Sequence, residues 1–143
     1  MLAKSAGSLG ASVDPAPLGA ELRPDKEGFL TLTETGVKSN FAQDLSEEEQ
    51  DLLYVAQAPT AGAALGASIR QPAWKTKPSW YLVATADRAI QPELQRTMAR
   101  RIKATTVEVA ASHVAMLARP EETANLVLDA ASLCFADRSI GTK

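Results

Sequence analysis

The sequence lacks what several classes of protein require. Its one cysteine, Cys134, cannot form an internal disulfide or a cysteine-based metal site, and its place on an apolar helical stripe indicates a packing role. No stretch approaches the roughly 18 consecutive apolar residues that a membrane-spanning helix needs. The 15 basic residues are outnumbered by 17 acidic ones, so no basic surface is available to attract nucleic acid or anionic lipid.

The beginning of the chain also lacks the features of a secretory signal. Lys4 is not followed by a continuous apolar stretch, so we predict no signal peptide and expect a cytoplasmic location. The composition is otherwise that of a globular protein, with 45% hydrophobic residues. A length of 143 residues corresponds to one domain or part of one. The sequence predicts neither a cofactor nor a bound metal.

Composition and periodicity divide the chain into four regions. Residues 1–27 are rich in Gly, Ala, Ser and Pro and predict a loop or a disordered segment. Residues 28–74 predict a small, mostly helical subdomain, in which the capping-box sequence Ser46-Glu47-Glu48-Glu49 begins a helix. Residues 75–136 predict alternating strands and helices, and residues 137–143 form a tail.

The third region has the pattern of an α/β protein. Residues 80–86 are continuously apolar or small, which is typical of a buried strand in a parallel sheet. Pro92 can occupy the first turn of a helix, and residues 105–109 predict a second strand. A final helix begins at Pro120. This β-α-β-α order predicts two parallel strands.

Two residues with acid–base chemistry follow these strands. Asp87 comes directly after the first strand, and His113, the only histidine, lies just past the second. In open α/β sheets, functional groups gather beyond the carboxyl ends of the strands. A carboxylate there can accept the imidazole N–H, fix its tautomer and stabilise the imidazolium. Asp87 and His113 are therefore candidate catalytic residues; alternatively, Asp87 is a turn or cap residue and His113 is structural.

The nucleophile that such a pair would serve is not found in this sequence. A serine nucleophile on an α/β sheet is usually carried by the turn G-x-S-x-G. Residues 10–14 and 66–70 come nearest to this motif, but both lack its last glycine and neither follows a predicted strand.

Residues 74–87 resemble bacterial α/β-hydrolase fold proteins related to plant hydroxynitrile lyases and methylesterases. The likeness continues through residues 90–96 and 104–113 and extends more weakly over residues 14–131 in all. The resemblance implies the C-terminal β-α-β-α portion of an α/β-hydrolase, preceded by a small, mostly helical cap. It also implies that Asp87 is the acid and His113 the base of a catalytic triad.

The resemblance leads to an expected function with two alternatives. We expect a truncated, esterase-like hydrolase for small esters or amides that is inactive alone, because the nucleophile turn and the oxyanion hole are missing. The alternatives are a non-catalytic module that binds small molecules or protein, and a non-functional gene remnant.

Two further residues and one strand edge are candidates for binding. Trp80 and Met116 are predicted either to line a substrate pocket or to pack in the core. The strand at residues 80–86 lacks a neighbour on one side, because its usual partner belongs to the part of the fold that is not present here. Such an unpaired edge predicts self-association or pairing with a complementary chain.

Overall fold

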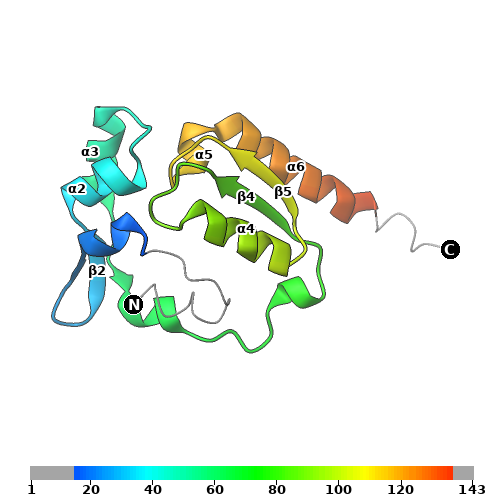
Figure 1. Cartoon of the computed structure of the whole chain (residues 1–143), viewed down its shortest axis with the longest axis horizontal. Helices are drawn as coiled ribbons and strands as arrows, with labels where there is room; N and C mark the ends of the chain where they lie inside the picture. Colours follow the sequence, from blue (N-terminus) through cyan, green and yellow to red (C-terminus); the bar gives the residue numbers. More distant parts are fainter. Residues whose placement is uncertain (1–14, 137–143) are drawn as a thin grey trace.

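The computed structural model describes residues 15–136, with side chains up to Ser132 (Figure 1). The predicted tail at residues 137–143, the first 14 residues of the predicted N-terminal loop and the side chain of Cys134 lie outside the described residues. The described elements follow one another in this order: η2 (Pro17–Glu21), β1 (Leu22–Pro24), β2 (Phe29–Leu32), α2 (Glu34–Gly36), η3 (Val37–Phe41), α3 (Glu47–Ala56), β3 (Thr60–Ala61), η4 (Gly62–Gly66), η5 (Ala73–Lys75), β4 (Trp80–Ala84), α4 (Pro92–Arg101), β5 (Thr105–Val109), α5 (Ala115–Ala118) and α6 (Pro120–Ala136).

A small antiparallel sheet, in the order β1-β2-β3, opens the described chain. The turn between β1 and β2 is closed by Asp25, whose Oδ1 accepts the N–H groups of Glu27 and Phe29. Gly28 lies in this turn with φ +85°, a conformation that a side chain would strain. Residues 17–24 were expected to be loop or disordered, and the structure corrects this. A three-residue edge strand ending in Pro24 carries almost no periodicity, and its pairing with β2 depends on tertiary contacts.

Two helix starts between β2 and β3 are capped by side chains, and the second of them was predicted from the sequence. The Thr33 hydroxyl accepts the N–H of Gly36 and caps α2. At α3, Ser46 and Glu49 form the predicted capping box, with each side chain bonding the other residue's backbone N–H. The structure adds the β1-β2-β3 sheet to a region that was expected to be mostly helical. The boundaries of the predicted domains stay predictions.

The second half of the described chain is built around two parallel strands. β4 pairs with β5 from Trp80 opposite Thr105 to Ala84 opposite Val109, as the β-α-β-α pattern predicts. Helices α4 and α6 both pack on β4, and they lie on opposite sides of the strand pair (Figure 1). One core cluster joins Ala84 to Val109, Ala111 and Ala115.

The helices bury different residues from those that hydrophobic periodicity selects. Leu94 and Met98 in α4 and Ile102 at its C-cap recur every four residues, but the most deeply buried side chains of the helix are Gln95 and Ala99. In α6 the neighbouring apolar residues differ, because Leu126 is buried and Val127 is exposed. The buried face of α4 is therefore shifted by one residue from its apolar stripe.

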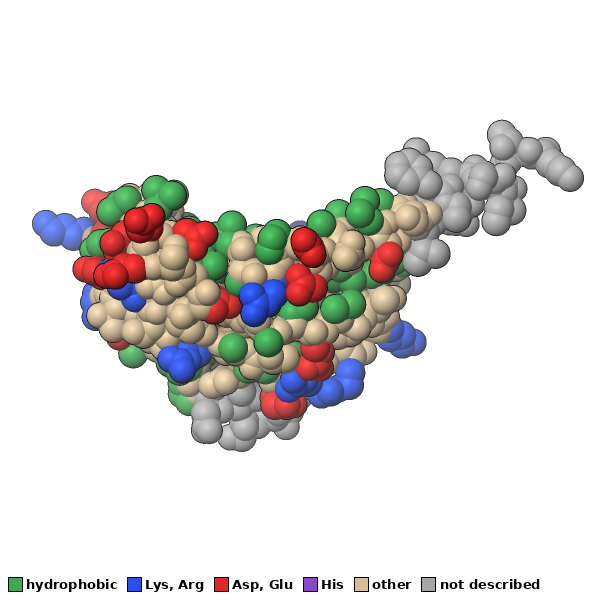
Figure 2. All heavy atoms as spheres, turned by 90° about the horizontal axis from the view of Figure 1, so that it is seen from above, with side chains coloured by type: hydrophobic (Ala, Val, Ile, Leu, Met, Phe, Trp, Pro, Cys, Tyr) green, Lys and Arg blue, Asp and Glu red, His purple; other side chains and the backbone are tan. Residues whose placement is uncertain are grey.

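Apolar surface remains exposed in several parts of the described chain, including α3 and the α5–α6 region. Within residues 15–136 β4 has only β5 as a strand neighbour, and its first three residues are half-buried. On α5 and α6 several large apolar side chains are exposed, among them Met116, Leu117, Val127 and Leu128. Figure 2 shows hydrophobic side chains over this part of the surface and acidic ones gathered at the α3 end.

The packing of β4 gives a first prediction. Val83 is fully buried, whereas Val107 on the neighbouring strand is 37% exposed. Val83→Ala leaves a cavity and is expected to lower the free energy of unfolding by about 2 kcal/mol, and Val107→Ala by less than about 1 kcal/mol. Urea denaturation of both variants measures the difference. Equal costs would contradict the difference in burial between Val83 and Val107.

Candidate active site

Asp87 lies in the turn that follows β4, and both of its carboxylate oxygens are bonded. Oδ1 accepts the backbone N–H groups of Ala89 at 2.7 Å and Ile90 at 3.0 Å. This local turn fixes the direction of the side chain, which is only 3% exposed. Helix α4 has Gln91, not Asp87, as its N-cap. The second oxygen, Oδ2, points away from the turn toward the loop after β5.

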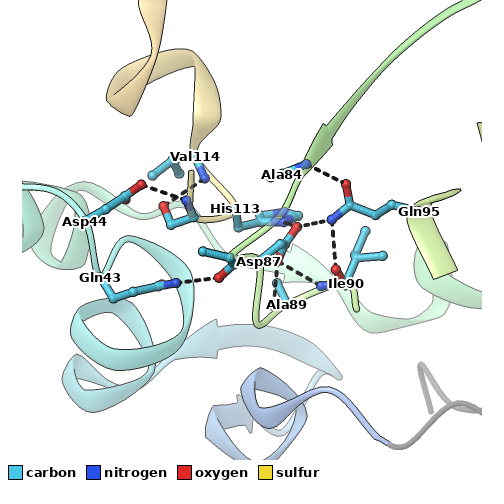
Figure 3. Close-up of polar contacts among 11 residues, drawn as sticks. Gln43, Asp44, Ala84, Asp87, Ala89, Ile90, Gln95, His113 and Val114 are labelled. Atoms are coloured by element: carbon cyan, nitrogen blue, oxygen red, sulfur yellow. Dashed lines mark hydrogen bonds and ion pairs between the residues drawn. The ribbon is translucent and has the colours of Figure 1, made fainter. Parts of the chain in front are cut away.

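The Oδ2 atom of Asp87 lies 2.8 Å from Nδ1 of His113 (Figure 3). A carboxylate has no proton to donate, so the proton of this hydrogen bond belongs to Nδ1. The lone pair of the neutral imidazole is therefore on Nε2. No hydrogen bond to Nε2 is found among residues 15–136, and the His113 side chain is 32% exposed. The two residues predicted to pair do so.

Segments from the first half of the described chain support the two loops. Gln43 donates to the carbonyl of Ala86 at 2.7 Å, and Oδ2 of Asp44 accepts the N–H of Ser112 at 2.7 Å (Figure 3). The ring of Phe41 lies 5.0 Å from the imidazole of His113, with the two planes tilted by 45°. The residues just before Asp87 and just before His113 are thus both held from the turn after η3.

Hydrogen bonding keeps Asp87 ionised despite its burial. Burial by itself raises the pKa of Asp87, but the hydrogen bonds from His113 and from the N–H groups of Ile90 and Ala89 outweigh this effect. The pKa of Asp87 therefore lies below its ordinary value. Burial and the charge of Asp87 both raise the pKa of the nearby Tyr81 hydroxyl.

Two cavities meet at His113. The larger, of about 530 Å³, is mainly apolar. Its lining includes Leu32 of β2, Phe41 of η3 and Ile90 from the turn after β4. The smaller, of about 310 Å³, is lined by Asp87 as well as by His113. Trp80 and Met116, the predicted substrate-binding residues, both line this smaller cavity. Their part in binding stays a prediction.

Several residues of the site were not predicted from the sequence. Gln95 donates to Oδ2 of Asp87 at 2.7 Å, and Gln43 and Asp44 hold the two loops. Gln95 sits four residues before Ala99 on one helical face, and a search for apolar residues passes over it. Gln43 and Asp44 bond backbone groups 43 and 68 residues away, and no local sequence pattern marks such partners.

The part of the chain that the structure describes lacks two other features. It contains no group of three or more His, Cys, Asp or Glu side chains able to hold a metal ion. No helix within it is both long and apolar enough to cross a membrane.

The sequence profile of the Alpha/beta hydrolase family matches residues 3–126. The chain belongs to the alpha/beta hydrolase family. Its parallel β4–β5 pair and the helices on either side form part of that fold. No curated protein matches this sequence significantly.

Solved structures with the same fold include polyneuridine aldehyde esterase. The match has a TM-score of 0.62 and 19% identity, and it covers 76% of this chain and 46% of the esterase chain. A histidine-to-alanine mutant of that esterase matches with the same TM-score and coverage at 18% identity. This chain therefore spans less than half the length of the structures it matches.

The hydrogen-bonded setting of Asp87 predicts that a neutral amide cannot replace it. In Asp87→Asn the side-chain NH₂ faces two donors, Gln95 Nε2 and His113 Nδ1, so buried polar groups lose their partners. We expect a loss of about 2–3 kcal/mol in the free energy of unfolding at pH 7, measured by denaturant titration. The control is Asp25→Asn, an exposed aspartate that also accepts two backbone N–H groups, with an expected cost below about 0.5 kcal/mol.

The difference in stability between wild type and Asp87→Asn should depend on pH. The pKa of Asp87 is lower in the folded chain than in the unfolded one, so its ionised form stabilises the fold above pH about 3.9. That stabilisation is lost as the pH falls through the lower, folded pKa. The difference in the free energy of unfolding between wild type and Asp87→Asn should therefore become smaller as the pH is lowered. A gap that is constant from neutral to acidic pH would contradict an ionised, hydrogen-bonded Asp87.

Proposed function

We propose that this chain carries the acid and base of a serine hydrolase that acts on small esters or amides. The observation that carries the proposal is the hydrogen bond between Asp87 and His113 at the edge where β4 and β5 end. Because no G-x-S-x-G turn is present in these 143 residues, the nucleophile and the oxyanion-hole donors come from polypeptide outside them. The chain by itself is then inactive.

The arrangement of the pair defines its chemistry. Asp87 holds the Nδ1–H of His113, so Nε2 can take the proton of a serine hydroxyl as its oxygen attacks the carbonyl carbon of the substrate. The imidazolium formed is stabilised by the carboxylate and then gives this proton to the departing alkoxide or amine. In the second half of the reaction, Nε2 takes a proton from water as the water oxygen attacks the acyl carbon. The imidazolium then returns this proton to the serine oxygen, and the carboxylic acid is released.

The cavities beside His113 support small substrates. Volumes of about 310 and 530 Å³ fall in or near the lower part of the range for ligand pockets. Trp80 and Met116 offer apolar contact on one side of the imidazole, and Ile90 lines both cavities. One cavity would receive the acyl part of the substrate and the other its leaving group.

The polypeptide that supplies the nucleophile and the oxyanion-hole donors could bind at the free edge of β4. The edge of β4 away from β5 has no strand neighbour among the described residues, and apolar side chains are also exposed on α5 and α6. A complementary chain that supplies further strands would pair with this edge and cover apolar surface. Self-association of this chain through the same edge is the competing outcome. A cytoplasmic location is part of this proposal.

Ester hydrolysis tests the proposal directly. With a p-nitrophenyl ester the purified chain should show no turnover above background. The coding sequence immediately upstream, if it carries a G-x-S-x-G segment, should restore hydrolysis when expressed with the chain. His113→Ala and Asp87→Asn should then lower the restored rate by about a thousandfold or more, because the members of a triad act as a unit.

The control is Asp129→Asn, which changes an exposed carboxylate on α6 in the same way and should leave the rate unchanged. A restored rate that survives His113→Ala would refute the assigned roles. Fast hydrolysis by the chain alone, abolished by His113→Ala, would refute its inactivity.

The larger cavity favours a second candidate, a module that binds small apolar molecules without catalysis. Anilinonaphthalene sulfonate, a dye that fluoresces in apolar surroundings, should bind with one site per chain. Leu65→Asp places a charge in the cavity wall and should weaken binding at least about tenfold, whereas Leu128→Asp on α6 should not. Equal binding by both variants and wild type would mean that the dye does not occupy this cavity.

A further inference from the structure

We propose that Gln95 is a positioning residue that holds the carboxylate of Asp87 against His113. This inference rests on the proposed function only for the role of Asp87 as the triad acid. The contacts of Gln95 with the strand end and with the turn stand independently of that role.

The side-chain amide of Gln95 is fully bonded within the chain. Its Nε2 donates to Oδ2 of Asp87 at 2.7 Å and to the carbonyl of Ile90 at 2.8 Å (Figure 3). Its Oε1 accepts the N–H of Ala84 at 3.1 Å. These partners allow one amide orientation only, since a carboxylate and a carbonyl require donors and an N–H requires an acceptor. The residue is only 3% exposed, so water cannot replace these bonds at little cost.

Gln95 also takes the place of a strand neighbour at the end of β4. The N–H of Thr85 bonds the carbonyl of Val109 on β5, and backbone groups alternate in direction along a strand. Ala84 therefore faces the edge of β4 that has no neighbouring strand. At this edge the N–H of Ala84 donates to Oε1 of Gln95. The carbonyl of Ala84 accepts the N–H of Asp87 at 3.3 Å. The position of Asp87 is thus set without strands from outside this chain.

The bond from Gln95 also acts on the charge of Asp87. His113 and Gln95 donate to the same oxygen, Oδ2, while two backbone N–H groups donate to Oδ1. Each donor stabilises the ionised carboxylate, so the loss of one raises the pKa of Asp87. The loss of alignment with His113 acts in the same direction. The ionisable groups that interact with Asp87 are His113 and Tyr81, and neither variant described below alters them.

The test is to measure the pKa of Asp87 by carboxyl ¹³C NMR in the chain labelled at aspartate. Gln95→Met keeps the size of the side chain and removes all three hydrogen bonds; it should raise the pKa of Asp87 by about one unit. Gln95→Glu keeps an acceptor for Ala84 but places a second carboxyl group against Asp87. The two should then titrate as a coupled pair, with the higher apparent pKa raised further than in Gln95→Met.

The matched control is Gln91→Met, the same substitution four residues earlier, at an N-cap whose side chain makes no capping hydrogen bond. It should leave the pKa of Asp87 unchanged. An unchanged pKa in Gln95→Glu would overturn the proposal, and so would an unchanged pKa in a folded Gln95→Met. Should Gln95→Met fail to fold, Gln95→Glu decides alone. The titration needs no turnover, so a failed hydrolysis test refutes the proposed function and leaves this inference intact.

Discussion

The pairing of β4 with β5 is the constraint on which the site depends. Their parallel register sets Ala84 opposite Val109, so both strands end at the same edge of the sheet. Asp87 and His113 follow these ends by three and four residues, and short turns carry them into contact. A shift of the register by one residue would turn every side chain of one strand to its other face and would separate the two loops. The hydrogen bond between the acid and the base is therefore a consequence of backbone pairing.

Groups outside the Asp87–His113 pair fix the positions of the two side chains. The turn at Ala89 and Ile90 fixes one oxygen of Asp87, and Gln95 and His113 share the other. On the opposite side of the site, Phe41 lies beside the imidazole. The buried carboxylate of Asp87 is stable here because each of its oxygens accepts two hydrogen bonds, and these bonds compensate for the water it has lost.

The sequence is informative where chemistry follows a local pattern. A continuous apolar strand that ends in Asp87, and a second strand that ends near the only histidine, were enough to predict the pair and the parallel sheet. Ser46 and Glu49 likewise predict the start of α3, because a capping box is complete within four residues. The short strand β1 escaped prediction, since its pairing with β2 is decided by tertiary contacts rather than by its three residues.

Gln95 and Asp44 escaped prediction for a related reason. Their partners are backbone groups and a carboxylate that only the folded chain brings near. Periodicity assigned the inner face of α4 to its larger apolar residues, whereas the space beside the end of β4 admits a polar side chain that replaces a missing neighbour. The burial of Gln95 can therefore be predicted only after the end of β4 has been placed beside it in the fold.

The turn that follows η3 is hydrogen-bonded to the loops of Asp87 and His113 through consecutive residues, Gln43 for the first loop and Asp44 for the second. A displacement of this turn would carry the two loops in the same direction, so the separation between carboxylate and imidazole would change little. Movement of the β1-β2-β3 region, for example to admit a ligand to the larger cavity, could then alter access to the imidazole while its partnership with the carboxylate persists.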